Sequence, residues 1–150
     1  MLTEGAYDRF AEVALVQPFE KSLQEKQRRM DAALAAFGRL VDYEVGEVTA
    51  AATFYMAEVY RDFSQALLAS ERPADLAPAE LVDYELVLEE EAFPFEEKAI
   101  AVHEKNLELM HAGVYNRWIE KSLAQLGVLM PGRYAKVEES SGWLVSVDRY

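Results

Sequence analysis

The chain has 150 residues and a mass of 17.0 kDa, which is enough for one domain. Acids outnumber bases 27 to 15, and the net charge of -12 argues against nucleic acid or an anionic membrane surface as a partner. The absence of cysteine excludes a disulfide scaffold, a thiolate metal site and a thiol nucleophile. No apolar stretch approaches the roughly 18 residues of a membrane-spanning helix. We therefore expect no direct membrane insertion and a soluble protein, with cytoplasm and periplasm both left open.

The spacing of apolar residues predicts an all-α fold of about five helices, separated by glycine and proline. The expected helices cover residues 3–16, 19–45, 47–71, 78–113 and 114–130. Pro18 is expected to start the second helix, and Gly46 to stop it. Pro94 lies inside otherwise helical sequence and predicts a kink or short break near Phe93.

We expect a helical domain over residues 1–132 and an irregular C-terminal tail over residues 133–150. The tail carries the strand-like run Trp143–Val147, but the chain offers no second strand to pair with it. Trp143 is expected to cover the apolar end of the last helices. The alternative is that it anchors a partner.

A repeat is visible in the second and fourth predicted helices. Ala33 is followed four residues later by Phe37, and Ala99 is followed in the same way by His103. The two pairs lie 66 residues apart, which is close to two units of about 34 residues. Small residues at such positions let neighbouring helices approach closely, and the rings pack between successive hairpins.

The third and fifth predicted helices carry a different, matching pattern. Met56 and Ala57 form a large–small pair that is followed by the ring of Tyr60. A weaker copy in the fifth helix has Trp118 in the first position and Ser122 in the last.

These residues resemble the tetratricopeptide repeat (TPR) family, over about residues 18–130. The resemblance implies antiparallel helical hairpins stacked in a short right-handed superhelix, whose first helices line a concave surface. It further implies that the residues between the packing positions of those helices contact a peptide or partner helix. The residues at these positions are Phe54, Glu58, Arg61, Asn116 and Glu120.

Candidate metal ligands are few. Glu108 and His111 form a Glu-x-x-His pair, but di-iron bundles need two such pairs. The other histidine, His103, has Ile100 three residues before it, so we predict no metal site. The alternative hypothesis is a helical bundle that binds a metal or small ligand through Glu108 and His111.

Motifs of known catalytic sites are missing from the sequence, whereas one run of acidic residues stands out. The sequence has no glycine-rich phosphate loop and no nucleophile elbow, so we predict no catalytic residues and no cofactor. Residues 89–91 and 96–97 are all glutamate. This acidic cluster is either a solvated helix face or a site for a cation or a basic partner.

The sequence is thus interpreted as a non-enzymatic protein–protein interaction module. It would act as a TPR-like adaptor or scaffold in a multiprotein assembly, for which an association with a bacterial envelope is conceivable. The expected partner is a protein or peptide. Self-association into a homo-oligomer through the exposed end of the helical array is a further hypothesis.

Overall fold

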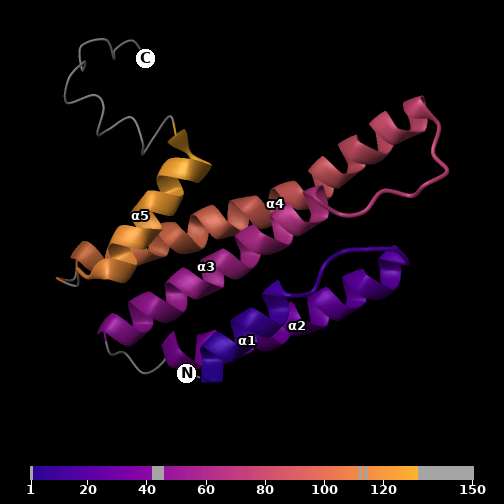
Figure 1. Ribbon diagram of the computed structural model, residues 1–150. Helices are drawn as coiled ribbons and strands as arrows, with labels where there is room; N and C mark the ends of the chain where they lie inside the picture. Colours follow the sequence, from indigo (N-terminus) through magenta and orange to yellow (C-terminus); the bar gives the residue numbers. More distant parts are fainter. Residues whose placement is uncertain (1, 42–45, 112, 114, 132–150) are drawn as a thin grey trace, which may run out of the picture.

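The computed structural model describes residues 2–41, 46–111, 113 and 115–131, and its regular structure over these residues is helical (Figure 1). The predicted all-α fold is therefore confirmed. The helices are α1 (Leu2–Ala11), α2 (Phe19–Val41), α3 (Gly46–Leu68), α4 (Pro78–His111) and α5 (Arg117–Leu129). No helix among the described residues is both long and apolar enough to cross a membrane.

Helix α3 occupies the centre of the arrangement. It lies between the pair α1–α2 and the long helix α4, while α5 crosses one end of α4 (Figure 1). The most extensive interface joins α3 to α4, and α3 also contacts α1, α2 and α5. No comparable interface joins α5 to α1 or α2 in the described part of the chain. The helices therefore form an open row and not a closed ring.

The apolar core follows this row. Phe10, Phe37 and Phe63 bring one completely buried ring each from α1, α2 and α3. A second cluster at the α5 end contains Phe54 from α3 and Trp118 from α5, with ring centroids 5.7 Å apart. Burial of these large apolar rings helps drive the helices together.

Helix α1 is shorter than predicted, because it ends at Ala11 and not at Val16. The buried Lys26 of α2 donates hydrogen bonds to the carbonyl oxygens of Phe10 and Val13, at 3.0 and 2.8 Å. A cation at this position satisfies the last carbonyls of the helix and favours its negative end. The following residues leave the helix, and the carbonyl of Leu15 accepts a hydrogen bond from the backbone of Glu71.

The boundary between α2 and α3 also differs from the prediction. Helix α2 ends at Val41, and residues 42–45 lie outside the described part of the chain. Gly46 opens α3 and does not close α2. At the other end of α3, Ser70 donates to the carbonyl of Leu67 at 2.7 Å, and Arg72 donates to that of Leu68 at 2.9 Å. These two side chains satisfy the free carbonyls of the last turn, so the helix ends before the expected Glu71.

Helix α4 begins at Pro78, as predicted, and runs through Pro94 without a break. Its start is supported by Glu80, whose carboxylate accepts a hydrogen bond from the backbone of Ala77 at 2.9 Å. Pro94 is exposed, so the carbonyl that loses its helical partner there is close to solvent. Of the kink or short break expected near Phe93, the break is therefore wrong, because the helix continues through this position.

Helix α5 begins at Arg117, three residues later than predicted. The side chain of Asn116 caps it by accepting hydrogen bonds from the backbone of Trp118 and Ile119. The predicted tail over residues 133–150, including Trp143, lies outside the described residues.

Candidate functional site

A groove of about 680 Å³ lies between the end of α1, the segment that follows it, and the second half of α3. We call it the α1–α3 groove. It is lined by Ala11, Val13, Ala14, Leu15, Val16, Lys26, Asp62, Gln65, Ala66, Ala69 and Glu71. Most of these side chains are small or apolar, and Lys26 and Asp62 place a cation and a carboxyl group among them. Such a surface suits an extended peptide with one apolar side chain and hydrogen-bonding groups beside it.

Lys26 is the buried cation of this groove, with 2% of its surface exposed. Burial lowers the pKa of its ammonium group, and the negative charge of Asp62 opposes this shift. The ammonium group donates to two backbone carbonyls and lies 4.2 Å from the centroid of the Phe10 ring. These contacts replace water around the charge and fix Lys26 against the end of α1.

Asp62 and Tyr7 join α3 to α1 beside Lys26. The hydroxyl of Tyr7 donates a hydrogen bond to the Asp62 carboxylate. Burial raises the pKa of Asp62, and burial together with the Asp62 hydrogen bond raises the pKa of Tyr7. Arg61 lies 3.8 Å from Asp62 and supplies a compensating positive charge. The pair is thus a structural link across the groove, with Tyr7 neutral at ordinary pH.

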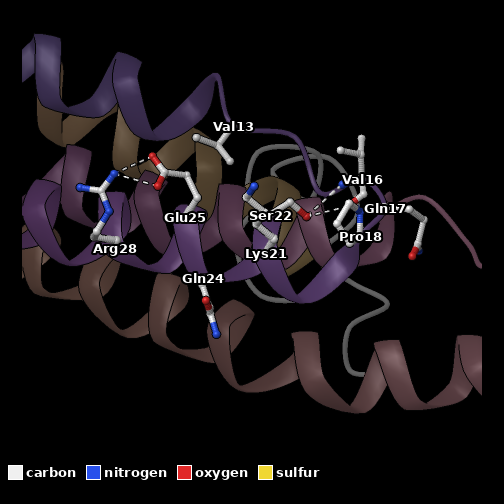
Figure 2. A pocket seen from close by; sticks show the side chains of 9 residues that line it. All are labelled: Val13, Val16, Gln17, Pro18, Lys21, Ser22, Gln24, Glu25 and Arg28. Carbon is white, nitrogen blue, oxygen red and sulfur yellow. Dashed lines mark hydrogen bonds and ion pairs between the residues drawn. The ribbon is translucent and has the colours of Figure 1, made fainter.

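A second hollow of about 580 Å³ lies on the other side of the segment 12–18, against α2 (Figure 2). Figure 2 shows Arg28 bonded to Glu25 along the wall of this hollow and Ser22 bonded to Val16 nearby. The hydrogen bonds from Arg28 and Arg29 lower the pKa of Glu25. Glu25 and Arg28 of this hollow are therefore paired with one another. We take the α1–α3 groove as the candidate site, because it is the one of the two that reaches the surface of α3.

The residues predicted for partner binding on α3 lie elsewhere. Phe54 is buried, with its ring packed against those of Trp118 and Tyr55. Glu58 is buried one turn further along, and Arg61 is partly exposed at 3.9 Å from it. The structure therefore brings Glu58 and Arg61 together, but places Phe54 in the apolar cluster between α3 and α5.

The two predicted residues near α5 have different surroundings. Asn116 caps the helix and has its side-chain oxygen occupied by that role. Glu120 is exposed and accepts a hydrogen bond of 2.7 Å from the hydroxyl of Tyr115. Of the five predicted residues, Glu120 is the one that is exposed.

Glu58 belongs to a buried cluster that joins α3, α4 and α5. We call this cluster the polar joint; it consists of Glu58, His103, Asn106 and Ser122. Nε2 of His103 lies 3.1 Å from Oε2 of Glu58, and Nδ1 lies 3.0 Å from Oγ of Ser122. The amide of Asn106 donates to Oγ of Ser122 at 2.8 Å and to the carbonyl of Ala50 at 3.0 Å.

The tautomer of His103 with its hydrogen on Nε2 gives one continuous chain of donors through the polar joint. The Asn106 amide donates to Ser122, the Ser122 hydroxyl donates to Nδ1 of His103, and Nε2–H donates to the carboxylate of Glu58. Each link pairs two buried polar atoms that would otherwise have lost their water. Because the links cross three helices, the joint fixes the position of α5 and α3 against α4.

Serine, histidine and a carboxylate also form the catalytic triad of many hydrolases. In those enzymes the serine oxygen is open to the substrate. Here the side chains of Ser122 and His103 are completely buried. The geometry of the polar joint therefore suits the connection of helices, and it offers no oxygen that a substrate can reach.

The metal alternative depends on Glu108 and His111 pointing inward. Glu108 is exposed on α4, and the His111 side chain is outside the described part of the structure. Among the described residues no group of three or more histidine, aspartate or glutamate side chains is arranged to hold a metal ion.

Neither the polar joint nor the burial of Lys26 was predicted from the sequence. The signal for the joint is present: His103, Asn106 and Ser122 are polar residues that occupy positions of the apolar stripes. Lys26 lies within the polar run from Gln24 to Arg29, where spacing gives no sign that this one cation turns inward.

Comparison of the chain with protein-family models, with curated proteins and with solved structures finds no match.

Proposed function

We propose that this chain is a non-enzymatic protein–protein interaction module, built from antiparallel hairpins stacked as a short TPR-like right-handed superhelix. In this proposal α1, α3 and α5 are the first helices of successive hairpins, and α2 and α4 are the second. The module acts as an adaptor or scaffold that holds a peptide segment of another protein in the α1–α3 groove.

The order of helix contacts carries this proposal. Each helix contacts the next one in the chain, and α3 additionally contacts α1 on one side and α5 on the other. A stack of hairpins produces this order, because the first helices of adjacent hairpins lie side by side. A bundle around a ligand would instead close the row by bringing α5 onto α1 or α2, an interface that is missing between the described residues of these helices.

The small residues of the repeat pattern give further support. Ala33, Ala57 and Ala99 are completely buried, one in each of α2, α3 and α4. The two second-helix rings that follow at spacing four, Phe37 and His103, are buried as well. This packing is what the resemblance to TPR hairpins requires of these positions.

The groove between α1 and α3 then corresponds to the side on which the first helices meet. Phe54 and Glu58 are covered by α4 and α5. The accessible residues of α3 therefore lie on a different face of the helix, which borders the groove. Asp62, Gln65 and Ala69 share this face. Substituting Phe54 would test the core, whereas Gln65 and Ala69 can be changed with the core left intact.

The proposal can be tested with peptides selected from a displayed random library on the immobilised full chain. Their affinities are then measured by fluorescence anisotropy. We expect Gln65→Arg with Ala69→Arg to weaken binding of the selected peptides by about tenfold or more, because two long side chains fill the groove. The melting temperature should stay unchanged, since both positions are exposed.

A matched control introduces the same two arginines on α2. Gln27→Arg with Ala35→Arg changes the same residue types at exposed positions away from the groove. The control should leave peptide affinity unaltered. Equal weakening by both double variants, or a selection that yields no binding peptide, would contradict the proposal.

A further inference from the structure

The first half of α4, residues 78–93, carries an apolar stripe that nothing in the described structure covers. Val82 is 58% exposed, Leu86 is 53% exposed and Phe93 is 55% exposed. Their spacing of four and seven residues puts the three on one face of the helix. Leu88 and Ala92 are buried on another side of the helix, and Ala92 belongs to the core cluster that includes Phe63 and Leu67 of α3. We call the exposed face the α4 stripe.

Both edges of the α4 stripe are acidic. Glu89 and Glu96 lie along the edge that faces α3, while Asp83 and Glu90 lie along the other edge. Helix α4 as a whole has ten acidic residues and two lysines. No lysine or arginine of the described chain forms an ion pair with these four carboxylates. An apolar stripe between two unpaired acidic edges is complementary to an amphipathic helix with basic flanks.

A hollow of about 190 Å³ adjoins the stripe between α3 and α4. Its walls combine the apolar side chains of Leu68, Ala92 and Phe93 with the carboxylates of Glu89 and Glu96. An arginine or lysine side chain fits this combination, because its aliphatic stem packs on apolar surface while its charge reaches the carboxylates.

We propose that the α4 stripe docks a basic amphipathic helix of another protein. The apolar face of that helix covers Val82, Leu86 and Phe93, and one of its basic side chains enters the hollow beside Glu89. Residues 78–93 offer about 24 Å of helix for this contact. This docking surface is separate from the α1–α3 groove and does not depend on what that groove binds.

Charge decides between a foreign helix and a second copy of the chain. If the α4 of a second copy packed on the stripe, two acidic surfaces would face each other and repel. Arg28 and Arg29 of α2 do not remove this difficulty, because both are already paired with Glu25 at 2.7 and 2.6 Å. A helix rich in arginine or lysine gains the attraction that a second copy lacks.

The test uses a synthetic amphipathic peptide of about 18 residues, in which a leucine stripe is flanked by arginine and lysine. A peptide of the same composition but scrambled order keeps the charge and loses the stripe. Binding to the full chain is measured by fluorescence anisotropy. We expect the striped peptide to bind at least tenfold more tightly than the scrambled one, with weaker binding at high salt.

Variants of the chain then locate the contact. The triple variant Val82→Ser with Leu86→Ser and Phe93→Ser should weaken binding of the striped peptide by tenfold or more. The control Val128→Ser, at a residue of α5 that is 64% exposed, should leave binding unchanged.

The acidic edge is tested by Glu89→Gln with Glu96→Gln, which should weaken binding severalfold and reduce its salt dependence. The control Glu20→Gln with Glu47→Gln makes the same change of charge at two exposed positions outside α4. It should leave the affinity for the peptide and the salt dependence of binding unaltered. Because all these positions are at least partly exposed, circular dichroism should show each variant folded.

Three outcomes would overturn the proposal. Equal affinity for the striped and scrambled peptides would reduce the contact to nonspecific charge attraction. Undiminished binding by the triple serine variant would place the peptide elsewhere. A dimer mass in analytical ultracentrifugation that disappears in the triple variant would assign the stripe to a second copy of the chain.

Discussion

The two halves of α4 lie in opposite surroundings although they form one continuous helix. The second half lies between α3 and α5, where Ala99, His103 and Asn106 are completely buried. The first half extends from Pro78 past α3 (Figure 1), and its apolar residues Val82 and Leu86 face solvent. In the buried half, polar side chains occupy core positions, whereas in the exposed half, apolar side chains occupy surface positions.

The contrast shows that residues of α4 with unusual surroundings have two different roles, one inside the fold and one on its surface. Polar residues in a core lose water and need hydrogen bonds to offset that loss, and those of His103 reach both neighbouring helices. Apolar residues on a surface add little to the stability of the folded chain alone, and three of them in one stripe are the basis of our proposal that this face binds another protein. The second half of α4 thus holds the row of helices together, and in that proposal the first half provides the docking surface.

The largest effect is expected from breaking the polar joint. His103→Leu removes the hydrogen bonds to Glu58 and Ser122 and leaves the buried Glu58 carboxylate with only its longer contacts, to Gln125 at 3.5 Å and Arg61 at 3.9 Å. We expect the free energy of unfolding to fall by about 3 kcal/mol. Urea denaturation followed by circular dichroism measures the change. A loss below about 0.5 kcal/mol would mean that the joint contributes little to holding the helices together.

A smaller loss is expected at the next turn of the buried half. Asn106→Ala removes the hydrogen bonds to the carbonyl of Ala50 and to Ser122, which should cost about 2 kcal/mol. Thermal unfolding gives the value. If the Asn106 and His103 substitutions act through one network, their double variant will lose less than the two single losses added together.

Asp62 shows what burial does to a charged group outside the joint. Because its pKa is raised, the folded chain takes up this proton at a higher pH than the unfolded chain does. The ionised carboxylate therefore lowers stability above its raised pKa, and this penalty disappears as the pH falls through that pKa and below the ordinary value for aspartate.

Asp62→Asn should accordingly stabilise the chain at pH 7 by up to about 1 kcal/mol, since asparagine still accepts the Tyr7 hydrogen bond. The difference between the two proteins should shrink as the pH approaches 4. Urea titrations at both pH values provide the measurement. A variant that is less stable than the parent at pH 7 would show that the ionised Asp62 is favoured where it lies.

The smallest effect is expected in the exposed half of α4. Leu86→Ser should change the free energy of unfolding by less than about 0.5 kcal/mol, because the side chain is already in water. The same urea titration used for His103→Leu gives a direct comparison within one helix. A large loss at Leu86 would mean that the first half of α4 is packed in solution, and the contrast between the halves would fail.

Much of the helical pattern could be predicted from spacing alone. The start of α2 after Pro18 and the start of α4 at Pro78 follow from local rules for proline, which do not depend on the rest of the fold. The end of α1 could not be predicted in this way. It depends on Lys26, a side chain of the next helix, and on the backbone of Glu71, which reaches Leu15 from the loop after α3.

The candidate sites were harder to predict than the helices. The resemblance to TPR hairpins put Phe54 and Glu58 on a concave surface, but ring packing with Trp118 and the hydrogen bond to His103 hold both inside. Which face of a helix is covered depends on how α5 crosses α3 and α4, and a single helix period does not contain that information. The acidic cluster of α4 could be recognised from the sequence, whereas the exposure of Val82 beside it could not.

Hydrogen exchange along α4, followed by mass spectrometry, tests the central claim most directly. We expect slow exchange in the second half, residues 96–110, and fast exchange in the first half, residues 78–93. Adding the striped peptide should slow exchange in the first half and leave the second half unchanged. Uniform protection along the whole of α4 in the free chain, or slowing confined to the second half, would contradict the account.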